Sequence, residues 1–499
     1  MRRKNNLFRS PVFNILATLL LIAVLAFFYK YALSDYTNNL ENDLETINTD
    51  RLNQVEEAPK TADEALNAIG NADSVREIDI SLLEYCHDNI RDDIYDRIFE
   101  YIETNEYSDV MWEELCGYTL RALYDLAGGY TEDYNYIEIN DIGDSLTLAF
   151  AGDISLDTTA KHWWSPLVVH ANNRTNLLES AFSAELSEKM IGADLFSVNL
   201  ESPFISGDSQ PIDYKWRHGS SAENVTVLAT LGIDMVNIAN DRIYDYSAKG
   251  LTDTLNALEL NKIDYIGGGK NLDDARTPRY LIACGRKIAF VSAAQTKIDN
   301  TMAPEATAKA AGIIYATNST YFTAMISEAA ENADYVIVYT DWSNGTNETP
   351  DASQAVLAHN FVEAGADIVI GTKSTVLQSI EYYEGKPIIY GLGNFWYETD
   401  SHDALLLEIN FTRDTVYNTA SVADSHFDAT QTRYAINDEP VISCLPCVQN
   451  EAVTRLVLGT EAGNEIITKL VNISDGKIAI AEDGTLSEAE ASSKVTPAE

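Results

Sequence analysis

The stretch "VIGTKSTVLQ", residues 369–378, has the form of a buried strand followed by a loop. Val369, Ile370 and Gly371 predict the end of the strand, and the polar residues 372–375 stand where ligand-binding loops follow strands in α/β proteins. This loop contains neither a histidine nor a carboxylate. The stretch therefore predicts the frame of a site that lacks the usual metal-binding side chains.

A similar pattern recurs along the central part of the chain. A small or glycine-containing turn leads through aspartate into an apolar strand in "GADLFSVNLE" (192–201), "GIDMVNIAND" (232–241), "NADYVIVYTDW" (332–342) and "GADIVIGTKS" (365–374). Each segment predicts a helix that ends at Gly or Asn and is followed by a buried strand. This alternation from about 145 to about 410 predicts an α/β domain.

Polar residues stand at the far ends of these strands. Asp153 follows "LTLAFAG", Glu201 follows "LFSVN", Asn240 and Asp241 follow "MVNIA", and Asp341 follows "YVIVYT". Ligands bind at the carboxyl ends of strands in α/β sheets, and acids gathered there suit a hard cation or a hydrolytic water. Any one of these residues could instead be a helix N-cap, so the interpretation as a site depends on their number.

The order of motifs resembles the capsule-synthesis CapA family, which is associated with bacterial poly-γ-glutamate capsules. The resemblance covers about 145 to 400 and is carried by "FAGDISLD", "NLESPF", "LGIDMVNIANDRIYDYSAKGLTDTL", "YIGGG", "GRKIAFVSA", "YTDWSNGTNETP" and "AGADIVIGTKSTVLQSIEYYEGKPIIYGLGNFWYE". It implies an α/β fold of the calcineurin-like metallophosphatase type, a four-layer sandwich in which helices flank two sheets.

The family-type histidines are replaced in this chain. The family typically has Asn-Asn-His at 240–242, His-Trp-Gly at 341–343 and Gly-His-His-Pro-His at 371–375, where this chain has Asn-Asp-Arg, Asp-Trp-Ser and Gly-Thr-Lys-Ser-Thr. The residues that match the family are Asp153, Glu201, Asn240, Asp245, Trp342, Gln378 and Gly393-Asn394-Phe395.

Loss of the imidazoles removes the neutral nitrogen ligands of a two-metal hydrolytic centre, while Arg242 and Lys373 add positive charge. Buried carboxylates need a counter-charge, which these two cations could supply unless they point into solvent. The sequence thus favours a metal-free site held by ion pairs. The candidate residues are Asp153, Glu201, Asn240, Asp241, Arg242, Asp245, Asp341, Trp342, Lys373, Thr375 and Asn394.

Two classes of function follow. The favoured one is a non-catalytic or weakly catalytic protein that acts with a capsule or cell-wall polymer or with its synthesis machinery and needs no cofactor. The alternative is an active hydrolase or transferase that uses Asp153, Glu201, Asn240 and Asp341 around Mg²⁺, Mn²⁺ or Ca²⁺. Nucleic acid is excluded as a partner because the formal net charge is −43, and the same charge disfavours direct capture of poly-γ-glutamate without bridging cations.

The N-terminal residues predict the location. Basic residues precede an apolar run from Pro11 to Tyr29, which predicts a single transmembrane helix with a cytoplasmic N-terminus and the bulk of the chain outside the cytoplasm. A signal peptide cleaved near 32–34 is the alternative, and it also predicts export.

The chain divides into further predicted segments. We expect a basic stub and anchor at 1–34, an acidic stalk at 35–60, a helical module at 61–140, the α/β domain at 145–410, a strand-rich extension at 411–480 and a disordered acidic tail at 481–499. The spacing of Cys86 with Cys116 and of Cys444 with Cys447 leaves disulfides open.

Overall fold

The computed structural model describes residues 122, 135–139, 144–159, 165–213, 217–295, 303–317, 319–342, 346–417, 432–436 and 439–489. The predicted membrane anchor, the stalk and almost all of the predicted helical module lie outside these residues. In the part that is described, no helix is both long and apolar enough to cross a membrane.

The larger of the two main sheets in the described residues has nine strands and carries most of the site. Its strand order is β19-β18-β16-β1-β2-β5-β6, with β15 also paired to β1 and β17 to β16. The parallel half comprises β1 (Ser145–Ile154), β15 (Asn394–Trp396), β2 (Leu195–Leu200), β5 (Met235–Asn237) and β6 (Asp264–Ile266). The antiparallel half comprises β16 (His402–Tyr417), β17 (Thr432–Ile436), β18 (Val441–Asn450) and β19 (Val453–Leu456).

The second main sheet has six strands in the order β13-β14-β12-β11-β9-β8. These strands are β8 (Arg279–Ala283), β9 (Arg286–Val291), β11 (Tyr335–Asp341), β12 (Ile368–Thr372), β13 (Ile380–Tyr383) and β14 (Lys386–Ile389). Strands β9, β11, β12 and β14 are parallel. They are buried apolar runs, as expected for parallel strands covered on both faces.

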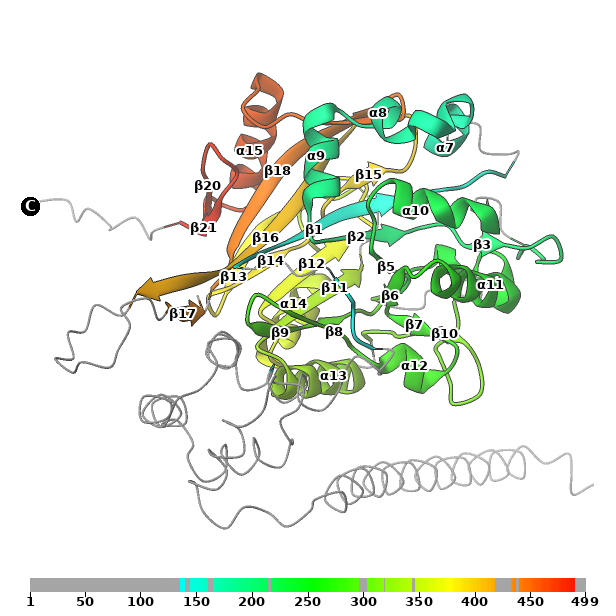
Figure 1. Ribbon diagram of the computed structural model, residues 1–499, viewed down its shortest axis with the longest axis horizontal. Helices are drawn as coiled ribbons and strands as arrows, with labels where there is room; N and C mark the ends of the chain where they lie inside the picture. The colour runs from blue at the N-terminus through cyan, green and yellow to red at the C-terminus, as the bar shows by residue number, and fades with distance from the viewer. Residues whose placement is uncertain are drawn as a thin grey trace, which may run out of the picture.

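The two sheets pack face to face around a shared apolar core, with Phe150 of β1 touching Phe290 of β9 and Tyr339 of β11. Helices cover the outer faces, so the described domain has four layers (Figure 1). On the larger sheet they are α7 (Pro166–Val169), α8 (Leu177–Ala181), α9 (Ala184–Gly192), α10 (Thr226–Thr230) and α11 (Ser247–Leu260). On the smaller sheet they are α12 (Leu272–Arg276), α13 (Ser319–Asn332) and α14 (Ala352–Glu363).

The ends of the outer helices follow from local sequence. Helix α14 begins with a capping box, because Asp351 accepts from the N–H of Gln354 while the Gln354 side chain accepts from the N–H of Asp351. Ser183 caps α9 by accepting from Leu186 N–H. These caps fix where each helix starts relative to the strand that follows it.

The predicted tail at 481–499 is wrong for its first half. Strand β21 (Leu486–Glu488) pairs antiparallel with β20 (Ile478–Ile480), and Leu486 is buried against the core. A turn at Gly484, which has a positive φ, allows the chain to double back. Helix α15 (Glu461–Ile473) lies beside this hairpin, and β18 and β19 continue the same sheet as β1.

The cysteines of "CLPC" form no disulfide, and each of the two thiols is buried in a different core. Side chains alternate along β18, so Cys444 faces the core between the sheets and Cys447 faces the helical layer. Burial raises the pKa of each thiol to about 12, which makes both unreactive.

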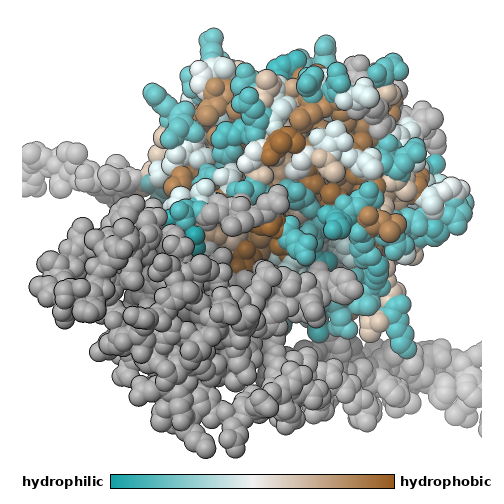
Figure 2. Space-filling model, in the orientation of Figure 1, coloured by the Kyte–Doolittle hydropathy of each residue, from teal (hydrophilic) through white to brown (hydrophobic). Residues whose placement is uncertain are grey.

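Exposed apolar side chains are scattered over the described surface. Val169, Ile191, Leu260, Val356 and Val441 are exposed and lie on five different elements. Figure 2 shows apolar and polar side chains interspersed on the face that it presents. Isolated exposed apolar residues are normal on soluble domains and mark no docking surface.

Candidate functional site

A row of polar side chains crosses the carboxyl end of the larger sheet. Asn394 of β15, Asp153 of β1, Asn199 of β2 and Asn237 of β5 are in register on neighbouring parallel strands. Residues in register share a face of the sheet, so these four side chains lie side by side. All four are buried.

Asn199 is the centre of this row. Its Nδ2 lies 2.7 Å from Asp153 Oδ1, 3.2 Å from Asp341 Oδ2 and 3.4 Å from Glu201 Oε1. A single amide group thus donates toward three buried carboxyl groups that come from both sheets.

The orientation of the Asn199 amide is fixed by its neighbours. The Oδ1 atoms of Asn237 and Asn240 accept from the backbone N–H groups of Ala239 and Ile243. Their Nδ2 groups therefore donate, and each lies 3.0 Å from Asn199 Oδ1. Since the oxygen of Asn199 accepts these two bonds, its nitrogen must face the carboxyl groups.

The smaller sheet brings a cation to the same place. Asp341 ends β11, and its register partner Thr372 ends β12, directly before Lys373. Lys373 Nζ lies 2.5 Å from Asp241 Oδ1 and 3.5 Å from Asp341 Oδ1. The lysine therefore bridges carboxylates of the two sheets.

The backbone of Lys373 also serves the site. Its φ is +75°, a left-handed conformation that is uncommon for a residue with a side chain. In this conformation its N–H donates to Asp153 Oδ1 at 3.2 Å. The loop is thus held by the site through both the main chain and the side chain of one residue.

The carboxyl groups exceed the cations in number, and the pKa values reflect this excess. Burial and the neighbouring charge of Asp341 raise the pKa of Asp153 to about 7. Burial raises that of Asp341 to about 6 although Lys373 lowers it, and burial together with Asp153 raises the pKa of Glu201 well above its usual range. Part of this cluster therefore holds protons near neutral pH.

A second ion-paired group stands beside the first. Burial raises the pKa of Asp241, but Lys373 and Arg242 outweigh it, so the net shift is downward. Arg242 Nη1 lies 3.9 Å from Asp245 Oδ2, and Asp245 accepts from the backbone N–H of His218 at 2.6 Å. Burial raises the pKa of Asp245 to about 7. The side chains of Arg242 and Lys373 are 18% and 23% exposed, so neither extends freely into solvent.

Of the residues predicted for the site, Trp342 does not lie in it. Strand alternation turns Trp342 away from the face of Asp341, and it is fully buried against Phe361 and Tyr390, with Nε1 donating to the Tyr390 carbonyl. Thr375 is half-buried in the loop. Asn394 lies next to Asp153, and its buried Nδ2 has no hydrogen-bond partner among the described residues.

Sequence reasoning missed several residues of the site. Asn199 and Asn237 stand inside apolar strands. Burying a side-chain amide without a hydrogen-bond partner is unfavourable, so an Asn at such a position was the available signal. Ser155, His218 and Tyr397 form a hydrogen-bonded series at the same edge, with Ser155 Oγ 3.2 Å from His218 Nδ1 and Tyr397 Oη 3.4 Å from His218 Nε2. His218 comes from a loop without periodicity, so no local pattern indicates it.

In this structure N–H donors already contact some of the carboxyl oxygens that a metal centre would use, because Asn199 Nδ2 contacts one oxygen of each of three acids and the Lys373 ammonium contacts two acids. Within the described ranges, no group of three or more His, Cys, Asp or Glu side chains has an arrangement that could hold a metal ion.

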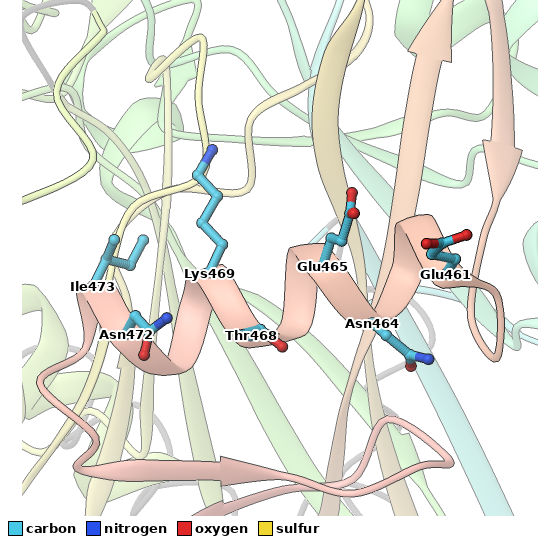
Figure 3. A pocket seen from close by; sticks show the side chains of 7 residues that line it. All are labelled: Glu461, Asn464, Glu465, Thr468, Lys469, Asn472 and Ile473. Atoms are coloured by element: carbon cyan, nitrogen blue, oxygen red, sulfur yellow. The ribbon is translucent and has the colours of Figure 1, made fainter.

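A separate hollow of about 710 Å³ lies along α15. Figure 3 shows its lining residues, with Glu465 and Lys469 on one side of the helix. Lys469 Nζ is already paired with Glu348 at 2.9 Å and Asp403 at 3.3 Å. This hollow is remote from the carboxyl ends of the parallel strands and offers no comparable chemistry (Figure 1).

Comparisons with known proteins agree on one family. Residues 147–399 match the family described as bacterial capsule synthesis protein PGA_cap. The chain is 28% identical over 275 residues to the capsule biosynthesis protein CapA of Bacillus anthracis, covering 53% of this chain and 64% of that protein. It is 30% identical over 227 residues to the PGA biosynthesis protein CapA of Bacillus subtilis (strain 168), covering 44% and 59%.

A more distant relative is a probable polyglutamine synthesis accessory protein of Mycobacterium tuberculosis. It is 26% identical over 243 residues, covering 46% of this chain and 63% of that protein. The matched part therefore spans less than two thirds of the length of each of these three relatives.

Proposed function

Because this chain belongs to the bacterial capsule synthesis protein family PGA_cap, we propose that it acts in the synthesis, export or anchoring of a cell-envelope polymer, poly-γ-glutamate or another capsule. Its similarity to two proteins named CapA supports this role. We further propose that the four layers are a calcineurin-like metallophosphatase sandwich, adapted to a function outside the cytoplasm.

The proposed site is an ion-paired remnant of a metal centre with little or no catalytic activity. The observation that carries this proposal is the Lys373 ammonium, which lies between Asp241 and Asp341 where a catalytic centre would need a cation. The family-type histidines are replaced. The side-chain N–H groups of Asn199 contact one oxygen of each of three carboxyl groups. Such a site can hold the loop after β12 in one conformation without metal.

The proposed location is a single membrane anchor with the domain outside the cytoplasm. The basis is the sequence, in which the basic residues precede the apolar run 11–29. Protease added to intact cells from which the outer wall has been removed should digest the large domain. A domain that stays protected would contradict this location.

The polymer role is tested by deleting the gene and measuring the envelope-attached polymer. We expect the amount of polymer to fall, and the full-length chain to restore it. Asp153→Asn should also restore it, because an isosteric amide keeps the shape of the site and a non-catalytic site needs no carboxylate chemistry. An unchanged amount of polymer after deletion would contradict the proposed role.

The alternative is an active hydrolase or transferase. It is favoured by the convergence of Asp153, Glu201 and Asp341 on Asn199, with Asn240 bonded to the same amide. Under this alternative, the Asp153→Asn variant would fold but would not restore the amount of polymer in the deletion strain. The same complementation experiment therefore separates the two functions.

A further inference from the structure

The contacts of Ser155, His218 and Tyr397 determine which group donates and which accepts in each hydrogen bond of this series. Ser155 Oγ is 3.4 Å from Asp157 N–H, which can only donate, and 3.2 Å from His218 Nδ1. Among the described residues, the imidazole is therefore the available acceptor for the Ser155 hydroxyl proton. This makes Nδ1 the acceptor and Nε2 the protonated nitrogen of a neutral His218.

The series then ends at a hydroxyl group. With Nε2 protonated, His218 donates to Tyr397 Oη, and the tyrosine proton must be directed elsewhere. In the described part of the chain, the Tyr397 hydroxyl has no other hydrogen-bond partner. Since each bond in a series polarises the next, the bond from His218 favours donation by the Tyr397 hydroxyl group.

Tyr397 is positioned firmly enough to serve as a binding group. Its backbone N–H donates to Gln449 Oε1 at 2.8 Å, and its ring lies 5.5 Å from the ring of His218. The preceding residue, Trp396, accepts from the backbone N–H of Ser155 at 3.0 Å. Tyr397 as a whole is half-buried, whereas Asp153 and Glu201 are buried.

A second histidine in the same molecule shows what a closed series looks like. His170 Nδ1 lies 3.2 Å from Ser180 Oγ, the same distance as in the Ser155–His218 pair, and its exposed fraction of 6% is close to the 8% of His218. However, His170 Nε2 lies 3.0 Å from the Ala452 carbonyl, which can only accept. The series through His170 therefore ends at a backbone carbonyl, whereas the series through His218 ends at the Tyr397 hydroxyl group, which can still donate.

The charges around Tyr397 select the ligand. Glu201, Asp153 and Asp241 act on its hydroxyl together with the opposing charge of Arg242, so carboxyl groups outnumber cations there. A carboxylate ligand would add one more acidic group to a cluster that already retains protons, whereas an uncharged carbonyl oxygen would accept the tyrosine proton without that penalty. In a polyamide, such oxygens belong to the backbone amides and not to the side chains.

We propose that Tyr397, supported by His218 and Ser155, donates a hydrogen bond to an uncharged amide carbonyl of the ligand. This assignment deepens the proposed function and rests on it, since an amide-linked polymer such as poly-γ-glutamate supplies that group. The site then binds the backbone amides of the polymer, while the carboxylate side chains of the polymer face solvent and bridging cations.

The test uses the full-length chain labelled with ¹⁵N-histidine and two small probes of nearly identical shape. Glutaramide carries two uncharged amides, and glutarate carries two carboxylates on the same carbon chain. We expect glutaramide to shift the ring signals of His218, identified by their loss in His218→Gln, and to leave those of His170 unchanged. Tyr397→Phe should weaken the glutaramide response about tenfold or more.

The matched control is Tyr383→Phe, which removes a hydroxyl bonded to Glu363 on the smaller sheet and should leave the response unchanged. The urea midpoint of each variant shows whether it is folded. His218→Gln provides a second test, because losing the polarising group should weaken binding measured by calorimetry even if Tyr397→Phe is unstable. An equal or stronger response to glutarate, no response to either probe, or a full response in folded Tyr397→Phe would overturn the proposal. Polymer amount in cells tests the broader function separately.

Discussion

Two lysines of this domain each bridge two aspartates, but only the exposed lysine lowers the pKa of both partners. Lys249 Nζ lies 2.6 Å from Asp253 and 3.3 Å from Asp208 at the surface, and the lysine side chain is 46% exposed. There the pKa of Asp253 is lowered to about 2, because hydrogen bonds from Lys249, Ser206 and Ser209 outweigh the effect of burial. At the surface, one lysine together with serine hydroxyl groups lowers the pKa of both of its aspartate partners.

Lys373 makes the same kind of bridge in the site, between Asp241 and Asp341, yet the pKa of Asp341 is still raised to about 6 because burial exceeds the effect of the lysine. The difference shows that the buried site holds more carboxyl groups than its cations can neutralise. Its stability therefore depends on each N–H donor and on the protons that it retains.

The largest expected effect comes from adding one more charge to the centre of the row. Asn199→Asp places a carboxylate against three others and removes the N–H groups that hold them, which should lower the free energy of unfolding by about 3 kcal/mol or more. Urea unfolding of the purified chain measures this change.

The matched control is Asn410→Asp on β16, opposite Thr147 near the start of β1, where Asn410 Oδ1 accepts from the Thr147 hydroxyl. A carboxylate can accept this bond equally well, so the control should have little effect on stability. If Asn199→Asp behaves like the control, Asn199 is not the centre of the network.

The next largest effect is a difference in the loss of stability when each of the two lysines is replaced by alanine. Lys373→Ala removes the bridging cation from a largely buried site and should lower the free energy of unfolding by about 1–3 kcal/mol. Lys249→Ala, at the exposed bridge, should lower it much less, because solvent screens an exposed ion pair. Equal losses in the two variants, measured under the same conditions, would show that the environments do not differ as described.

Much of this arrangement could be predicted from the sequence, because Asp153, Glu201 and Asp341 each follow an apolar run. Parallel strands bring their carboxyl ends to one edge, so convergence follows from the pattern. Lys373 was expected near these acids as a counter-charge, and it lies 3.5 Å from Asp341. Trp342 was wrongly predicted to lie in the site. Side chains alternate along a strand, so Trp342, one position after Asp341, faces the opposite side.

The remaining residues depend on contacts that no local pattern encodes. His218 and Ser155 are 63 residues apart, and only the pairing of β1 with β15 also brings Tyr397 beside them. Strand β20 lies within the predicted strand-rich extension, but β21 was missed because residues 481–489 are mostly polar and acidic, although Leu486 is buried in the core.

The pH dependence is a smaller effect. Because the pKa of Asp153 is raised to about 7 and that of Asp341 to about 6, the folded state retains protons that the unfolded state releases above about pH 4. These two groups therefore make stability fall as pH rises from about 4 to about 7.

Asp153→Asn removes one of these titrations and should reduce the loss of stability between about pH 5 and about pH 8 by roughly 1–2 kcal/mol. Urea midpoints at the two pH values measure it. A variant that loses as much stability as the wild-type chain over this range would show that Asp153 titrates normally.

The central claim is that Lys373 supplies charge where a metal would otherwise be needed. The most direct test is the metal content of the purified full-length chain, measured by elemental analysis after dialysis against metal-free buffer and again after exposure to Mn²⁺, Zn²⁺ or Mg²⁺. We expect much less than one bound metal ion per chain in every case, with a higher content only when histidines are introduced by Lys373→His together with Thr375→His. A tightly bound metal pair in the unaltered chain would contradict it and support the hydrolase alternative.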